Sequence, residues 1–357
     1  MRKERVLSWA ALVTVWVVWG STYFGISVAI ETIPPFLMAG FRFLVAGLLV
    51  LAVVGPRHAR GARRPTWPHI RSAVIIGALM LVGGNGLVSA GEEHLDSGLA
   101  ALVVATVPVW MVLINALVTR TRIAATVVAA LLLGTVGIGV LVGGPGGEVH
   151  AGAVAMVVIA SALWAAGSVY ARSAPLPSHP MVVTAIEMIA AGVMLLLLGV
   201  ALGEPARLRL SEVSAASLAG LAWLVFAGSI VAFTAYMYAN STLPNDTVAT
   251  YAYVNPVIAV ILGVALGDES LGANVYLGGA IIVGAVVLIV TGRSAKRRSD
   301  RAARPAPTDR PTAPEPLPGS TEHRADPAPR PGTAAPAPAP APATCTSTAT
   351  PEDTTTP

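Results

Sequence analysis

The sequence predicts an all-α integral membrane protein with ten transmembrane helices, arranged as two inverted five-helix repeats. Three observations predict this fold. Of the 357 residues, 54% are hydrophobic and only 12% are charged, whereas soluble domains carry about 25% charged residues. Apolar runs of about 20 residues, the length that crosses a bilayer, recur along the chain. Finally, the first half of the chain is echoed in the second half.

Each expected span is an apolar run bounded by the Pro, Gly and charged residues that end helices. The first run follows a basic N-terminus as a signal peptide does, but it is too long and no small-x-small cleavage site follows it. We therefore expect a retained helix. Glycine-rich runs, such as the one at 83–86, favour close contact between helices in lipid. The ten spans are 7–29, 36–54, 70–90, 97–118, 123–143, 152–171, 181–202, 216–239, 246–266 and 274–292.

Lysine and arginine predict the orientation. Of the 23 Lys and Arg residues, Arg42 lies within a span, Arg207 and Arg209 lie in outer loops, and the other twenty lie on the side of the N-terminus. The positive-inside rule therefore places both termini in the cytoplasm. The net charge of +4 is a signal of topology, and no nucleic-acid partner is expected.

A change of composition at residue 293 predicts a disordered cytoplasmic tail, 293–357, rich in Pro, Ala and Thr. We expect its first basic cluster, residues 296–298, to contact anionic lipid headgroups. The one cysteine, Cys345, excludes a disulfide framework and a cysteine-rich metal site.

Internal similarity favours two repeats, 7–143 and 152–292. Pro108 in the fourth span falls opposite Pro256 in the ninth. A Trp and a Ser-x-Tyr motif recur between the first and sixth spans. Because each repeat has an odd number of spans, the second enters the membrane in the opposite sense, an architecture typical of transporters with a binding site at the midplane.

Three segments carry a family resemblance. They are WVVWGSTYFGISVAIETIPPFLMAGFRFLVAG at 16–47, VPVWM at 107–111 and AYVNPVIAVILGVALGDESL at 252–271. They resemble the EamA-type drug/metabolite transporters, most of all their YedA-like inner-membrane exporters. The resemblance covers about residues 8–292 and implies two EamA domains that move small molecules by alternating access, usually outward. Family members often carry a glutamate after the fourth span, where this chain reads TRTR at 119–122; only the second repeat keeps the acid, at 268–269.

Two ionisable residues lie inside spans, where a charge costs about 2.5–3.5 kcal/mol on insertion scales. Arg42 and Glu187 occupy equivalent positions of the two repeats. With a rise of 1.5 Å per residue in a core about 30 Å thick, their levels differ by roughly 12 Å. We expect separate roles: Arg42 holds an anionic group of the substrate towards the outer side, and Glu187 binds a coupling proton near the inner mouth. Satisfaction by backbone carbonyls or snorkelling is the alternative for both.

Tyrosine and amide side chains suggest one wall of a cavity. Tyr236 and Asn240 are four residues apart, as are Tyr251 and Asn255, so each pair shares a helix face. Neighbouring spans could bring both faces to one cavity, with helix packing as the alternative.

Further candidates follow from other features. The family resemblance implies that the first and sixth spans line the cavity, and Asn85 lies on a glycine-weakened helix as a cavity or hinge residue. Pro108 and Pro256 free backbone carbonyls in mid-span and are expected to bend their helices. The candidates of the first and sixth spans are Trp19, Ser21, Tyr23, Trp164, Ser168 and Tyr170.

The expected function is secondary transport: export of a small metabolite or drug across the inner membrane. The chain lacks the GxxxxGK[ST] motif that cradles phosphates, and no cluster of acids or histidines lies at a catalytic depth. We therefore expect no enzyme activity, no cofactor and no metal site. The acidic loop Glu92, Glu93, His94 and Asp96 is interpreted as solvated, with metal binding as the weaker alternative.

Other functions stay open at this point. They are an integral-membrane enzyme or lipid scramblase, a channel, and an importer of a small polar metabolite. The expected partners are the substrate, membrane lipids and a coupling proton. The oligomeric state is open, a homodimer included.

Overall fold

The computed structural model of the chain describes residues 2–59, 65–122, 125–143, 150–243, 245–248, 250–267, 269 and 272–302. Every regular element among these residues is a helix. Segments η1 and η3 are π-helical, and η2 is a single 3-10 turn. In chain order the elements are α1 (Arg2–Ile30), α2 (Pro35–Ala59), α3 (Trp67–Gly77), η1 (Ala78–Gly86), α4 (Leu87–Gly91), α5 (Ser97–Val104), α6 (Val107–Thr119), α7 (Ala125–Gly143), α8 (Ala151–Ala171), α9 (Pro180–Ala201), α10 (Glu204–Arg207), η2 (Leu210–Glu212), α11 (Ala215–Trp223), η3 (Leu224–Val231), α12 (Ala232–Thr242), α13 (Asn245–Val248), α14 (Tyr251–Leu266) and α15 (Ala273–Ala302).

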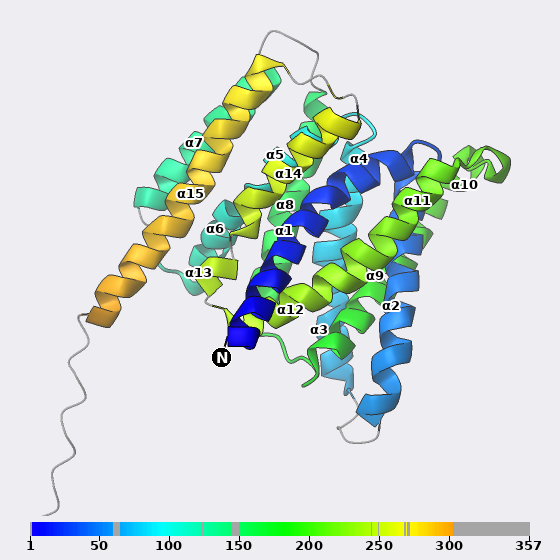
Figure 1. Cartoon of the computed structure of the whole chain (residues 1–357), viewed down its shortest axis with the longest axis horizontal. Helices are drawn as coiled ribbons and strands as arrows, with labels where there is room; N and C mark the ends of the chain where they lie inside the picture. Colours follow the sequence, from blue (N-terminus) through cyan, green and yellow to red (C-terminus); the bar gives the residue numbers. More distant parts are fainter. Residues whose placement is uncertain are drawn as a thin grey trace, which may run out of the picture. The chain divides into compact units, whose positions relative to one another are not determined.

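Seven helical segments of the described residues are long and apolar enough to cross a membrane, and in Figure 1 the long helices run alongside one another. Three further apolar helices are shorter: Val128–Val140, Val254–Leu266 and Ala273–Leu288. They fall in the expected spans 123–143, 246–266 and 274–292. The all-helical membrane class is therefore confirmed. The seven segments are Glu4–Ile30, Pro35–Gly55, Trp67–Gly91, Ser97–Thr119, Ala151–Ala171, Pro180–Ala201 and Ala215–Ala239.

The last helix is longer than expected. Helix α15 continues to Ala302, beyond the expected end of the last span at residue 292, and the disordered tail stays a prediction. The segment GRSAKRRSDRA at 292–302 is rich in Ala, Lys and Arg, which are good helix formers, and the first proline comes only at position 305. Residues 303–357 lie outside the described residues.

Helices α2 and α9 form a tight antiparallel seam. A Cβ added at Gly40 would lie 2.8 Å from the Leu196 side chain, and one at Gly47 would lie 2.9 Å from the Ile189 nitrogen. Glycine is therefore required at both points, because no side chain fits between the two backbones. Because the two helices are antiparallel, residue numbers that rise along α2 lie beside residue numbers that fall along α9. This seam fixes the relative level of every residue on the two helices.

The π-helical segments lie where two long helices contact their neighbours. Segment η1 contains the glycine-rich run, and Cβ atoms added at Gly83 and Gly84 would lie 2.7 Å and 2.9 Å from Leu163 and Trp164 of α8. The close helix contact expected from these glycines is thus confirmed. Segment η3 interrupts the helical span that begins at Ala215. A π-helical turn adds a residue to the turn and is frequent at functional sites.

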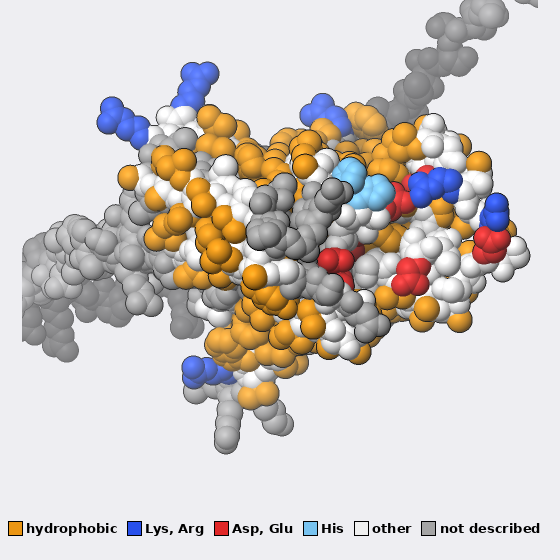
Figure 2. All heavy atoms as spheres, turned by 90° about the horizontal axis from the view of Figure 1, so that it is seen from above, with side chains coloured by type: hydrophobic (Ala, Val, Ile, Leu, Met, Phe, Trp, Pro, Cys, Tyr) orange, Lys and Arg blue, Asp and Glu red, His pale blue; other side chains and the backbone are white. Residues whose placement is uncertain are grey.

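Four connections meet at one end of the helices, which we call the acidic end: 31–34, 92–96, 202–214 and the connection after α14, of which the structure describes Gly267 and Glu269. Glu204 accepts the backbone N–H groups of Phe36 and Leu37, at 3.1 Å and 2.8 Å, at the start of α2. Glu269 accepts those of Ser97 and Gly98, at 2.9 Å and 3.3 Å, at the start of α5. Figure 2, a view from above Figure 1, shows acidic and histidine side chains on this face.

Candidate functional site

Arg42 is buried in the middle of the described helices, with only 4% of the residue exposed. Its Nε donates to Ser229 Oγ at 3.0 Å, and its Nη1 donates to Asn85 Oδ1 at 3.3 Å. Its guanidinium carbon lies 4.8 Å from the ring centre of Phe43. Among the residues that the structure describes, no carboxylate forms an ion pair with it. A buried cation held by neutral groups alone retains most of its desolvation cost, which an anion can offset.

The two hydrogen-bond acceptors of Arg42 come from the two π-helical segments. Asn85 belongs to η1 and Ser229 belongs to η3. Ser229 Oγ also donates to the Leu224 carbonyl at 2.9 Å, five residues back, as the wider π-helical turn allows. Asn85, which was predicted to be a cavity or hinge residue, therefore contacts Arg42. The side chain of Arg42 thus connects η1 and η3, which are far apart in the chain, by one hydrogen bond to each.

An aromatic cluster lies next to this charge. It consists of Trp19, Phe233, Tyr236 and Tyr251, from α1, α12 and α14. The Trp19 ring centre is 6.3 Å, 5.1 Å and 5.4 Å from those of the other three, and the two tyrosine rings are 6.0 Å apart. Trp19 Nε1 donates to the carbonyl of Gly228, the residue before Ser229, at 3.2 Å. The cluster and Arg42 therefore share one turn of η3.

Convergence of Tyr236 and Tyr251 was expected from their spacing, and the structure brings them together. Phe233 was missed, although a signal was present: it lies three residues before Tyr236 and so shares its helix face. The amides behave differently. With its amide oriented to suit its neighbours, Asn255 Nδ2 donates to the carbonyls of Trp16 and Tyr251, both at 3.2 Å. These contacts favour the helix-packing alternative. The side chain of Asn240 lies outside the described residues.

Five other candidates of the first and sixth spans contact neighbouring helices, and none of them belongs to the aromatic cluster. Ser21 Oγ accepts from Trp223 Nε1 at 3.1 Å, and the Tyr170 hydroxyl lies 3.4 Å from Ser72 Oγ. Tyr23 packs against the core that contains Leu99 and Val157, and Trp164 packs against the core that contains Phe43 and Met188. Ser168 Oγ donates to the carbonyl of Trp164 in its own helix at 2.9 Å and lies 3.9 Å from Met80 Sδ of η1.

Arg42 and Glu187 lie on the tight seam at different levels. Glu187 is two residues before Ile189, the neighbour of Gly47, so it lies level with residue 49 of α2, seven residues from Arg42. At 1.5 Å per residue the separation is about 10 Å, close to the 12 Å expected. Glu187 is half-buried, and its backbone carbonyl would lie 2.7 Å from a Cβ at Gly77 of α3. The geometry therefore keeps the two charges apart.

The two prolines do not act alike. Pro108 lies in the first turn of α6, after a break that ends α5 at Val104. A proline in the first turn replaces an N–H that would have no partner in any case. Pro108 thus lies just after a break in the apolar span Ser97–Thr119, and its role in bending that span stays a prediction. Pro256 lies inside α14, where it removes the hydrogen bond to the carbonyl of residue 252.

Glu92 contradicts the expectation of a solvated acidic loop. Glu93, His94 and Asp96 are exposed, but only 6% of Glu92 is exposed. Burial raises the pKa of Glu92 well above its usual range, the charge of Glu269 raises it further, and Arg42 lowers it. The loop was judged from its polar residue types, which do not show which side chain turns inward. Within the described ranges no three His, Cys, Asp or Glu side chains are grouped as metal ligands.

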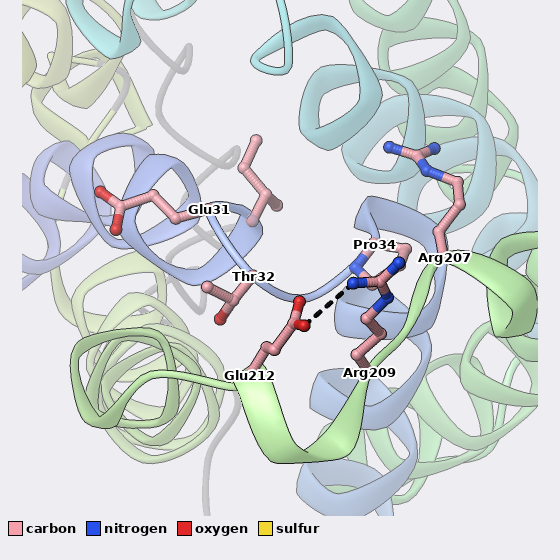
Figure 3. A pocket seen from close by; sticks show the side chains of 7 residues that line it. Glu31, Thr32, Pro34, Arg207, Arg209 and Glu212 are labelled. Atoms are coloured by element: carbon pink, nitrogen blue, oxygen red, sulfur yellow. Dashed lines mark hydrogen bonds and ion pairs between the residues drawn. The ribbon is translucent and has the colours of Figure 1, made fainter.

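An open pocket also lies at the acidic end. Its charged side chains are exposed, and Arg209 Nη1 donates to Glu212 Oε1 at 3.0 Å across it (Figure 3). Such solvated pairs bind small solutes weakly because water competes for both charges. The pocket is therefore a weaker candidate than the buried Arg42. It is lined by Ile30, Glu31, Thr32, Pro34, Arg207, Arg209 and Glu212.

Comparisons with known proteins identify the family of this chain. The EamA-like transporter family matches residues 7–143 and again residues 151–291. The uncharacterised inner membrane transporter YedA of Escherichia coli K12 is 39% identical over 303 residues, which cover 82% of this chain and 94% of YedA. A probable terminal-alkyne amino-acid exporter of Streptantibioticus cattleyicolor is 25% identical over 291 residues, 81% of this chain and 95% of its own length.

A crystal structure of a protein that is 19% identical aligns with 81% of this chain and 97% of its own chain, with a TM-score of 0.53. At this identity the likeness shows a shared fold only. The family match, the identity to YedA and the apolar helices carry the conclusion. The chain belongs to the EamA-like transporters, within the drug/metabolite transporter superfamily, and is a multi-pass membrane protein.

Proposed function

We propose that the protein is a secondary transporter of the inner (plasma) membrane that exports small metabolites or drugs by alternating access. In this proposal the ten apolar runs cross the membrane as two inverted five-helix repeats, 7–143 and 152–292, with both termini in the cytoplasm. The two separate family matches support the repeats. The π-helical segments support them too, because they start at Ala78 and Leu224, 146 residues apart, in the third span of each repeat.

The buried Arg42 carries the proposal of a substrate site. Its partners Asn85 and Ser229 are neutral, so they orient the guanidinium without cancelling its charge. A guanidinium pairs well with a carboxylate or phosphate because its N–H groups match two oxygens. We therefore infer that the substrate carries an anionic group that pairs with Arg42.

The aromatic cluster supplies the apolar half of the site. Trp19, Phe233, Tyr236 and Tyr251 offer ring faces and two hydroxyls beside the turn that holds Ser229. Sites of this kind bind amphipathic molecules, with a few polar groups fixing their orientation. An amino acid with an apolar side chain has both features, and one relative is named a probable amino-acid exporter. The substrate class proposed is therefore a small amphipathic carboxylate.

The π-helical segments are the proposed moving joints. Each supplies one contact of Arg42, so a shift of either segment changes the anion site. We also propose that Glu187 binds the coupling proton. It is the acid that lies well inside a span, on α9, the helix opposite that of Arg42 in the seam. Replacement by glutamine should then abolish transport that is driven by a pH gradient in proteoliposomes.

Comparison of metabolites in the growth medium tests the function. Cells that produce the protein should accumulate specific small carboxylates outside, relative to cells without it. Arg42→Gln should remove this accumulation at equal protein level, because a neutral side chain cannot pair with the anion.

Arg207→Gln is the matched control, since it removes an arginine that is largely exposed at the acidic end. It should export as well as the parent. Equal export by Arg42→Gln and the parent would refute the anion site, and accumulation of uncharged compounds alone would refute the substrate class.

A further inference from the structure

Glu92 follows helix α4 directly, and its side chain turns into the protein. Both carboxylate oxygens are buried, and neither has a hydrogen-bond partner among the described residues. An ionised carboxylate without donors is costly in a low-dielectric interior. Its position at the end of a helix adds to the cost, because the C-terminal carbonyls carry a partial negative charge. Glu92 therefore needs either a proton or a nearby cation.

Three ionisable groups from three other segments act on this carboxylate. Arg42 of α2 attracts it, Glu269 after α14 repels it, and Tyr23 of α1 lies within electrostatic range. Only Arg42 favours the ionised form. Among the described residues, no hydrogen bond satisfies this acid and no acid pairs with this cation, and the two charges act on each other through space without a direct bond.

We propose that Glu92 is a protonatable counter-ion of Arg42, which competes with the anionic ligand when ionised and leaves Arg42 to the ligand when protonated. This inference rests on the proposed anion site. The step is a simple protonation: the Glu92 carboxylate takes one proton from solution and becomes a carboxylic acid. The ligand remains a carboxylate, and no other bond forms or breaks.

The competition links ligand binding to pH. An anion beside Arg42 repels an ionised Glu92, so binding of a carboxylate is accompanied by uptake of a proton. Affinity then falls by up to about tenfold per pH unit once the pH exceeds the pKa of Glu92.

Infrared spectroscopy of the purified full-length protein tests the protonation without any ligand. The parent should show the C=O stretching band of a buried carboxylic acid, and raising the pH should remove it. The parent-minus-variant spectrum of Glu92→Gln should show the part of this band that belongs to Glu92, whereas the control Glu93→Gln, which changes the adjacent acid, should leave the band unchanged. A band that is unchanged in Glu92→Gln overturns the proposal.

Calorimetry with benzoate, an aromatic carboxylate, tests the link to the anion. Titrations in two buffers of different ionisation enthalpy give the number of protons taken up per benzoate. The parent should take up close to one proton above the pKa of Glu92, and Glu92→Gln should take up none and bind with an affinity that pH leaves unchanged. Proton uptake that persists in Glu92→Gln, or no benzoate binding at any pH, overturns the link.

Arg42→Gln separates this inference from the proposed function. It should lose benzoate binding yet keep the carboxylic-acid band of Glu92. If benzoate still binds to Arg42→Gln, the proposed anion site fails, while the infrared result on Glu92 stands independently.

Discussion

Two kinds of glutamate lie within the acidic end, and their surroundings give them opposite properties. Glu204, which is 3% exposed, and Glu269 each accept two backbone N–H groups at the start of a helix. Glu92, 6% exposed, follows the end of a helix and accepts none from the described residues. A helix start offers free N–H groups and partial positive charge, and a helix end offers the reverse. Glu204 and Glu92 are thus buried alike, yet Glu204 caps a helix start and Glu92 has no hydrogen-bond donor among the described residues.

Local backbone geometry places the capping acids. Gly203 has a φ of 77°, a left-handed conformation that favours glycine, and it turns the chain so that Glu204 faces the start of α2. Glu269 follows α14 and also accepts the hydroxyl of Ser97 at 2.6 Å. Both contacts join segments far apart in the chain. Glu269, which lies in the second family match (151–291), therefore caps a helix that lies in the first (7–143).

The largest effect is expected from removal of the caps. Glu204→Ala and Glu269→Ala should each lower the free energy of unfolding by about 2–4 kcal/mol, because each leaves helix N–H groups without an acceptor. Thermal unfolding in one detergent measures this loss, with Glu212→Ala, at an exposed ion pair, as the control. A loss no greater than that of the control would show that the carboxylates are not caps.

A pH-dependent effect of opposite sign is expected at Glu92. Its raised pKa means that the folded state binds the proton more tightly than the unfolded state. The resulting stability is present below the unfolded pKa and is lost as the pH rises through the folded pKa. Glu92→Gln should match the parent in acid and exceed its melting temperature in alkali. The pKa of Asp96 is also raised, by partial burial and by Glu269. Its contribution to the pH dependence of the stability remains in Glu92→Gln. Parallel pH profiles of parent and variant would contradict the assignment.

The smallest effect is expected at the surface. Arg207 pairs with Glu93, but its side chain is 59% exposed, so solvent screens the attraction. Arg207→Ala and Glu93→Ala should each change the stability by less than about 1 kcal/mol. A double-mutant cycle of the two measures the coupling. A coupling energy as large as the loss of stability expected for Glu204→Ala would mean that solvent exposure does not predict the strength of an ion pair at the acidic end.

The helices were predictable because apolar length and Pro, Gly and charge boundaries are local signals. The start of α5 at Ser97 and the end of α9 at Ala201 both lie within one residue of the expected positions. The meeting of Tyr236 and Tyr251 was predictable too, since it needed only helical spacing and a short connection. The separation of Arg42 and Glu187 followed from the helical rise alone.

The rest depends on contacts that no local pattern encodes. The groups that act electrostatically on Glu92 are Arg42, Glu269 and Tyr23, and all three come from other parts of the chain. Asn255 hydrogen-bonds the backbone of α1 at Trp16, which its own helix face does not reveal. The π-helical geometry of η1 and η3 was not predicted, although the glycine run at 83–86 did predict close contact with a neighbouring helix. The site thus combines a predictable aromatic half with a charged half that only the fold defines.

The glycine seam of α2 and α9 has a mechanical consequence. At Gly40, Gly47 and Gly192 one helix backbone rests against the other without space for a methyl group. Sliding either helix along its partner would drive the side chains of Leu44, Ile189 or Leu196 into that backbone. Helices α2 and α9 therefore move together as one rigid unit, and any bending takes place in the helices around them.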